Sequence, residues 1–259
     1  KHLPLLNGCA YLVTVVVNFF AVTTPFFGRR PGDVSHLYNN AFTPADFTFK
    51  IWPVIYALLA FFIWWQSARW FKRADRDPVE VQRVGYLFLL TCAFNICWLI
   101  SWQSLHLVWS FVFMVALWAT LIAIYYALAP MGRNHWMVTM PFSAYLAWVA
   151  VAALANLNVL LIEWGFNYFG LSAEAWTSLL IGVGVFGGYL VLWLNRDWWF
   201  SLVLIWALFG IYIKTSTPGA GGGIIVNVCL VGMLLLAMGA IFTAFNNRGQ
   251  GQKPLPNPV

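Results

Sequence analysis

Long, continuous runs of apolar residues make up most of the chain, and short polar segments separate them. The runs lie at residues 8–27, 49–70, 85–103, 107–129, 137–162, 176–194, 199–213 and 224–245. One helical crossing of a bilayer takes about 20 apolar residues. The pattern therefore predicts eight transmembrane helices, with seven as the alternative because the run at 199–213 is short. Because the runs do not alternate apolar and polar positions, they argue against a transmembrane β-barrel.

The composition supports the same fold class. Of the 259 residues, 62% are hydrophobic and only 8% are charged, against about 25% charged residues in soluble domains. Such a chain cannot form a water-soluble surface, which excludes a soluble enzyme, a disordered chain and a disulfide scaffold. We predict an all-α integral membrane protein, a polytopic bundle of about eight transmembrane helices. The first run lacks a small-x-small cleavage site, so we interpret it as a retained helix and not a signal peptide.

The positive charges predict an orientation. With eight crossings, ten of the 14 lysines and arginines fall on the face that carries both termini, and four fall on the other face. The positive-inside rule then places both termini on the cytoplasmic side, or on the equivalent stromal or matrix side. This distribution also accounts for the net charge of +6, so no nucleic-acid partner is predicted.

Residues that perform catalysis are sparse. The four cysteines lie inside apolar runs without C-x-x-C spacing, and the eight carboxylates lie in loops or at helix ends. The absence of an intramembrane carboxylate argues against an ion-coupled transporter. No motif for a nucleotide, a serine nucleophile or a zinc ion is present, so we predict no enzyme and no metal site. His106 at a membrane edge is either a solvated interface residue or a ligand of a tetrapyrrole metal.

Two lysines fall on the face opposite the termini. The segment Thr43-Pro44-Ala45-Asp46 has the residue order of a capped helix start, which predicts that the second helix begins there. Lys50 follows Asp46 by four residues, so the two can pair on one helical face. Such a pair is either structural or orients the carboxylate of a ligand. Lys214, at the end of the seventh run, is the second cation available to an anionic ligand.

Tryptophan is unusually abundant, with 16 residues in the chain. Most of them lie near the ends of the runs, where an interfacial aromatic belt explains them. The belt does not explain four that lie deeper, which are Trp98, Trp118, Trp148 and Trp206. A buried indole N–H needs an acceptor, and the flat ring suits stacking on a planar ligand. Each of these side chains either packs in the core or stacks on a ligand.

Asparagines within the runs point to the same region. Each needs a partner on another helix or on a ligand, because an unpaired amide inside a membrane is costly. They are Asn18, Asn95, Asn156 and Asn158. Helical spacing places Asn95 and Trp98 on one face. It also aligns four residues along the fifth helix, which are Tyr145, Trp148, Ala152 and Asn156. These positions either join helices or line a ligand cavity.

These patterns resemble the TspO/MBR family, also called the tryptophan-rich sensory protein or translocator protein family. The stripe from Pro141 to Asn156 is similar to that family's fifth helix, and Asn95-x-x-Trp98 is similar to its third. The segment from Phe42 to Val54 resembles the region that enters its second helix. A longer branch with extra C-terminal helices is still more similar, through motifs that begin at Phe42, Ile51, Asn95, Pro141, Ala155 and Trp206.

The resemblance implies a TspO-like five-helix bundle over residues 1–162, three additional transmembrane helices over 163–245 and a polar tail over 246–259. It also implies a pocket for a flat hydrophobic ligand such as a porphyrin or a sterol. The residues that it places at this pocket are Asn95, Trp98, Tyr145, Trp148, Ala152, Asn156, Trp52 and Lys50. One departure concerns Ile55, which stands where the family's P-V-W-T motif has tryptophan. This difference argues against the family's usual ligand specificity and against porphyrin degradation.

Three hypotheses of function follow. The first is a non-enzymatic membrane receptor or carrier whose ligand is a tetrapyrrole (porphyrin, haem or chlorophyll), a sterol or a lipid-like molecule. The second is an accessory or structural subunit of a larger respiratory or photosynthetic complex, with other membrane subunits or a second copy of the chain as partners. The third, a porphyrin-modifying enzyme, rests on analogy alone. In each case membrane lipids surround the helices.

Overall fold

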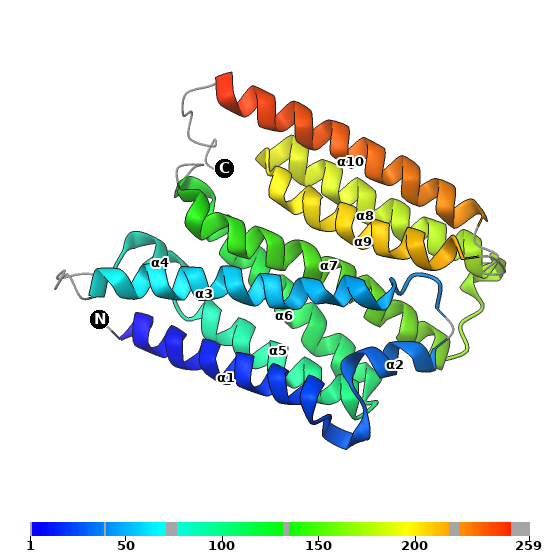
Figure 1. Ribbon diagram of the computed structural model, residues 1–259, viewed down its shortest axis with the longest axis horizontal. Helices are drawn as coiled ribbons and strands as arrows, with labels where there is room; N and C mark the ends of the chain where they lie inside the picture. The colour runs from blue at the N-terminus through cyan, green and yellow to red at the C-terminus, as the bar shows by residue number, and fades with distance from the viewer. Residues whose placement is uncertain (1, 39, 71–76, 132–134, 218–222, 250–259) are drawn as a thin grey trace. The chain divides into compact units, whose positions relative to one another are not determined.

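A computed structural model describes residues 2–38, 40–70, 77–131, 135–217 and 223–249. Within these ranges the regular structure consists of helices alone, and each predicted run forms a long helix (Figure 1). The long helices are α1 (Leu3–Thr23), α3 (Ile51–Trp70), α5 (Leu87–Gln103), α6 (Leu107–Leu128), α7 (Trp136–Glu163), α8 (Ala173–Asn195), α9 (Trp198–Thr215) and α10 (Gly223–Gly249). The short ones are η1 (Phe26–Gly28), α2 (Pro31–Leu37), η2 (Asp46–Lys50), α4 (Val79–Val84), η3 (Ala129–Met131) and η5 (Tyr168–Gly170). The predicted all-α fold class is confirmed.

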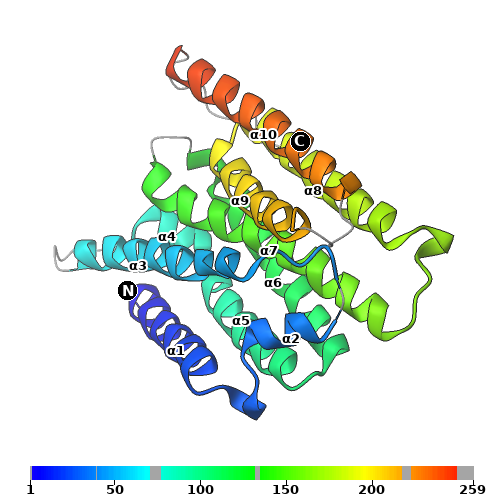
Figure 2. The ribbon, with the colours of Figure 1, turned by 45° about the vertical axis from the view of Figure 1, so that its right-hand side comes forward.

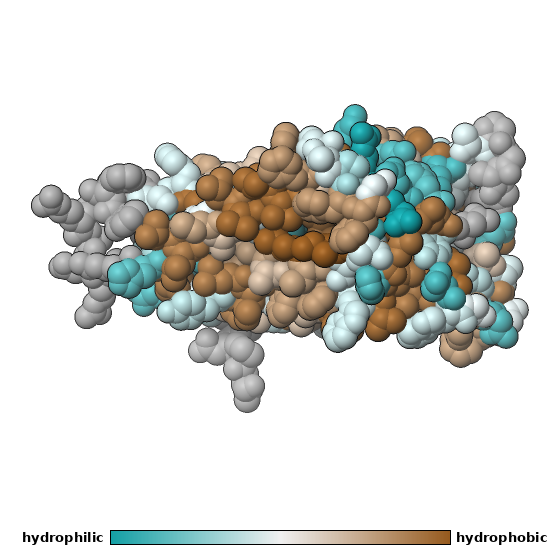
Figure 3. Space-filling model, turned by 90° about the horizontal axis from the view of Figure 1, so that it is seen from below, coloured by the Kyte–Doolittle hydropathy of each residue, from teal (hydrophilic) through white to brown (hydrophobic). Residues whose placement is uncertain are grey.

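Among the described residues, seven helical segments are long and apolar enough to cross a membrane. The run whose length was in question, at 199–213, forms the 18-residue α9 and is one of the seven. Helix α5 is the shorter apolar helix, with 17 residues. Many large apolar side chains lie on the outside of the helices. Figure 3 shows them as a broad brown patch on one face, with teal polar residues beside it.

The chain divides into two compact units. Of the described residues, unit 1 contains those within 1–31 and 52–146, and unit 2 contains those within 32–51 and 147–251. Helix α7 contributes its first part to unit 1 and its remainder to unit 2. The division of the sequence into domains at residue 162 stays a prediction.

In unit 1, α5 packs against α1 and α6, and α4 contacts α1 and α6 (Figure 2). Three fully buried phenylalanine rings, Phe62, Phe88 and Phe142, lie with their centroids 5.1–6.2 Å apart. At the end of α5, the buried Gln103 donates through Nε2 to the backbone oxygens of Ala21 and Arg29, at 3.0 and 2.6 Å. These bonds attach the end of α1 and the residue after η1 to α5.

In unit 2, α10 packs against both α8 and α9, and α8 contacts α9 (Figures 1 and 2). Glycine permits this close approach at Gly188, where an added Cβ would meet the side chains of Leu204 and Leu236. Small polar side chains cap the N-termini of α8 and α9, as is common in helices. Ser172 accepts a bond from the backbone of α8, and Asp197 accepts two from the backbone of α9.

The expected helix start at Thr43 is wrong. The first helical turn is η2, which begins at Asp46 after an extended Ala45, and no side chain caps it. Asp46 does not pair with Lys50 and instead lies 2.8 Å from the Nε2 atom of His36. The reason is geometric: a 3-10 helix has three residues per turn, so positions four apart do not share a face.

The predicted tail begins inside a helix. Asn246 and the three residues after it extend α10, and residues 250–259 lie outside the described residues.

Candidate functional site

Unit 1 contains a cluster of four aromatic side chains, which we call the aromatic cluster: Trp52, Tyr56, Trp98 and Tyr145. They come from α3, α5 and α7. The ring of Trp52 stacks on Trp98 at 5.8 Å and on Tyr56 at 5.7 Å, and it meets Tyr145 edge-on at 6.1 Å. Trp98 and Tyr145 are buried, at 6% and 3% exposure, whereas Trp52 is partly exposed. Tyr56 is partly exposed as well, so the two α3 members of the cluster border the outside of the unit.

Asn95 connects the aromatic cluster to α1 through hydrogen bonds. This side chain is fully buried in the middle of α5. Its Oδ1 atom accepts a bond from Asn18 Nδ2 of α1 at 2.8 Å, and its Nδ2 atom donates to the hydroxyl of Tyr145 at 3.0 Å. The expectation that the amides at positions 18 and 95 need partners on other helices is confirmed.

The chemistry that this arrangement offers is stacking and hydrogen bonding. The aromatic cluster presents flat rings with a neutral amide beside them. Two carbon atoms in contact lie about 3.5 Å apart, so a planar ligand between two rings needs them about 7 Å apart. The Trp52 and Trp98 centroids are 5.8 Å apart, so the stack is closed in this conformation. A ligand enters only if Trp52 turns away from Trp98.

Four of the predicted site residues belong to unit 2. Trp148 packs edge-on against Phe49 at 6.2 Å, and Asn156 donates to the backbone oxygen of Ala152 at 2.9 Å within α7. Lys50 ends η2 and is exposed. The structure thus brings together Asn95, Trp98, Tyr145 and Trp52 in unit 1. The other four are described only within unit 2, so a single pocket of all eight stays a prediction.

The other deep tryptophans differ from one another. Trp206 is partly buried, and its Nε1 atom donates to the backbone oxygen of Thr48 at 2.9 Å. Trp118 is 38% exposed on α6, whereas its neighbours Leu117 and Leu121 are fully buried. The expectation that Trp118 lies in the interior is wrong. The position of a residue along a helix does not determine whether its side chain points into the bundle or out of it.

Comparison with known protein families shows the family to which the chain belongs. A family model described as TSPO-like protein matches residues 4–242. The chain belongs to the TSPO-like protein family. The resemblance found from the sequence is therefore confirmed, and the match extends over the C-terminal helices. No curated protein and no solved structure matches the chain. Its family and its long apolar helices identify the TSPO-like chain as an integral, multi-pass membrane protein.

The described part of the TSPO-like chain shows no cluster of metal-ligating residues. Among the described residues, no three of the His, Cys, Asp and Glu side chains lie close enough to hold a metal ion. His106 is exposed at the start of α6, and its Nδ1 atom lies 2.8 Å from Ser104 Oγ. Cys9 is exposed on α1 and Cys92 is buried in α5.

Sequence reasoning did not find a polar network in unit 2. Asn40 Oδ1 accepts bonds from Phe42 N at 2.9 Å and from Asn158 Nδ2 at 2.6 Å, and Asn158 Oδ1 accepts a bond from Trp176 Nε1 at 2.9 Å. At the C-terminal end of α7, burial raises the pKa of the Tyr38 hydroxyl, and the hydrogen bond and charge of Glu163 raise it further. Asn158 stood out as a deep amide, but Asn40 lies in a loop with no motif that marks it.

Proposed function

We propose that this TSPO-like protein is a membrane receptor or carrier that binds a flat hydrophobic molecule at the aromatic cluster of unit 1. The ligand classes that suit it are a tetrapyrrole, a sterol or a lipid-like molecule. The observation that carries the proposal is the Trp52–Trp98 stack beside the buried amide of Asn95. The proposed role is non-enzymatic, since binding here relies on stacking and hydrogen bonding.

The proposed binding step is a movement of one side chain. Trp52 is partly exposed, so it can leave the stack without disturbing the fully buried core. A planar ligand then takes its place against Trp98 and regains the stacking energy that the two indoles lose. Asn95 supplies the polar contact, because an amide can both donate and accept. This geometry favours a ligand with a flat ring system and a polar group at its edge.

The predicted orientation belongs to the same proposal. The excess of lysine and arginine places both termini on the cytoplasmic, stromal or matrix side. The same rule predicts that Lys50, whose side chain is exposed, lies on the opposite face, where it could meet a ligand carboxylate. We expect the ligand to enter from that face.

A second candidate function is that of an accessory subunit in a larger membrane complex. One observation favours it. On α10, Leu234, Met238 and Phe242 are each more than 60% exposed, which leaves an apolar surface for lipid or another subunit to cover.

Replacing Trp52 with leucine tests the proposed site. We expect the affinity for protoporphyrin IX to rise about tenfold, because the ligand no longer has to break the Trp52–Trp98 stack, and one stacking contact contributes about 1.4 kcal/mol. The measurement is a titration of the purified protein in lipid nanodiscs, with empty nanodiscs subtracted for porphyrin that enters the lipid.

The matched control is Trp193→Leu, since Trp193 lies on α8 and is 74% exposed. It should bind protoporphyrin IX with the affinity of the unchanged protein. Both variants must keep the unfolding temperature of that protein. Equal affinities of the Trp52 and Trp193 variants would contradict the proposed site.

A further inference from the structure

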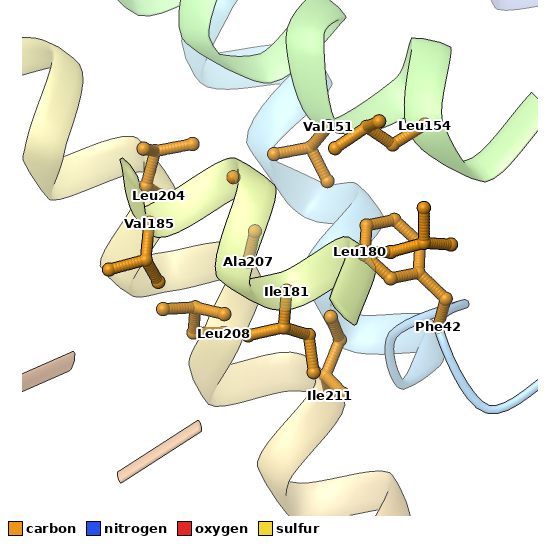
Figure 4. A pocket seen from close by; sticks show the side chains of 11 residues that line it. Phe42, Val151, Leu154, Leu180, Ile181, Val185, Leu204, Ala207, Leu208 and Ile211 are labelled. Atoms are coloured by element: carbon orange, nitrogen blue, oxygen red, sulfur yellow. The ribbon is translucent and has the colours of Figure 1, made fainter. Parts of the chain in front are cut away.

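Unit 2 contains a small, partly open apolar cavity (Figure 4). Its volume is about 20 Å³, and every residue that lines it is apolar or glycine. Helices α7, α8 and α9 supply the wall, including Val151, Ile181, Leu208 and Ile211. A space of this size holds little more than one water molecule, and an apolar lining keeps such a space dry. As it stands, the cavity accepts no larger ligand.

The side chain that limits the cavity comes from a loop. Phe42 lies between α2 and η2, whereas the other lining residues belong to the three helices. Its ring is 3% exposed and faces the cavity in Figure 4. Hydrogen bonds hold this loop in place: Phe42 N donates to Asn40 Oδ1 at 2.9 Å, and Ala45 N donates to Gly210 O at 3.1 Å. If the loop moves, the volume of a whole phenylalanine ring is added to the cavity.

A positive charge lies one helical turn beyond the cavity. Lys214 follows Ile211 by three residues on α9, so the two share a face. Its Nζ atom donates to the backbone oxygens of Asn40 and Thr43, at 3.1 and 3.0 Å, on either side of Phe42 in the loop. An ammonium group has three donors, and these bonds occupy two. In the part of the chain that the structure describes, no carboxylate lies within 4 Å of Lys214. Asp46 is the carboxylate whose charge acts on it from further away.

A polar atom of the loop itself also lacks a hydrogen-bond partner. The Nδ2 atom of Asn40 is buried without a hydrogen bond, on a side chain that is 4% exposed. The amide cannot simply be reversed, because its Oδ1 atom already accepts two bonds. A buried donor without an acceptor is costly. A carboxylate at the loop would supply acceptors to the loop and to Lys214 together.

We propose that unit 2 binds a carboxylate with a single short alkyl chain, with Phe42 as a movable plug. The carbon-lined cavity takes the chain after Phe42 swings out, and Lys214 pairs with the carboxylate. An aliphatic wall between three helices suits a flexible chain better than a flat ring system. This site is separate from the aromatic cluster of unit 1, so either can fail without the other.

The test is photo-crosslinking of the protein in nanodiscs with hexanoic acid that carries a diazirine at the chain end. We expect labelling of Ile181, Leu208 and Ile211, which are at most 6% exposed and so are shielded from bilayer lipid. Phe42→Ala should raise this labelling about tenfold at a limiting probe concentration, because the plug no longer has to leave its buried position. The matched control Phe186→Ala, at a ring 65% exposed on α8, should leave it unchanged.

Variants of Lys214 test the role of its positive charge separately. Lys214→Met should lower labelling by hexanoic acid about tenfold and leave labelling by the hexanol analogue unaltered. Lys214→Arg should keep the labelling by the acid. Phe42→Leu replaces Phe42→Ala if the latter does not fold. If the buried residues are not labelled, or if Phe42 variants do not change their labelling, the cavity is not a chain site. If acid and alcohol label equally and independently of Lys214, the assigned headgroup is wrong.

Discussion

Replacing Gly210 with alanine should lower the free energy of unfolding by about 3 kcal/mol, the upper range for overpacking a core. A Cβ at this position of α9 would collide with Thr48 Oγ1 and would lie 2.9 Å from the Cβ atoms of Thr48 and Pro44. Thr48 and Pro44 are buried and cannot move aside alone. The loop before α3 would have to separate from α9, which also breaks the bond from Ala45 N to Gly210 O. Thermal unfolding of the purified protein in detergent measures the effect.

The control is another helical glycine. Gly182 lies on α8, and an added Cβ there would meet no atom within 4 Å. Alanine has the better helix propensity, so Gly182→Ala should leave stability unchanged or raise it by up to about 1 kcal/mol. If both variants behave alike, the loop does not lie against α9 as described.

Replacing Asn95 with alanine should destabilise unit 1 by about 2 kcal/mol. The change removes the acceptor of Asn18 and the donor to Tyr145, and one interhelical hydrogen bond within a membrane contributes about 1 kcal/mol. The variant should also bind protoporphyrin IX more weakly, because the polar contact of the proposed site is lost. Denaturant unfolding and the porphyrin titration measure the two effects.

A double-mutant cycle separates the hydrogen bond from a loss of packing. Asn18→Ala and Asn95→Ala together should cost less than the sum of the single changes, since each already breaks the same bond. Asn167→Ala, at an exposed loop position, should have no effect. Additive costs at positions 18 and 95 would show that the two amides do not interact.

The fold was predictable because its cause is local in the sequence. Each crossing is a run of apolar residues, and each of the eight runs forms a helix. What the runs could not reveal was the path of the chain between them. The segment before α3 forms a 3-10 helix against α9. Its partners Trp206 and Gly210 are some 160 residues away in the sequence, and no local signal connects them.

The candidate site was predictable in part. Helical spacing placed Asn95 and Trp98 on one face, and they do lie at the same aromatic cluster. The same reasoning failed for Trp118, since a tryptophan deep in a run can face lipid as readily as protein. Asn40 carried no pattern at all, because its role depends on contacts with Asn158 and Lys214 that only the folded chain creates.

The most direct test of the receptor proposal is the native size of the protein together with its absorption spectrum. The protein is solubilised in a very mild detergent, protoporphyrin IX is added, and both properties are recorded on the same fraction. The account predicts a particle of one or two chains of 29.3 kDa that carries a Soret band, and a weaker band in the Asn95→Ala variant. Migration within a much larger complex, without porphyrin, would contradict the account and identify the chain as a subunit.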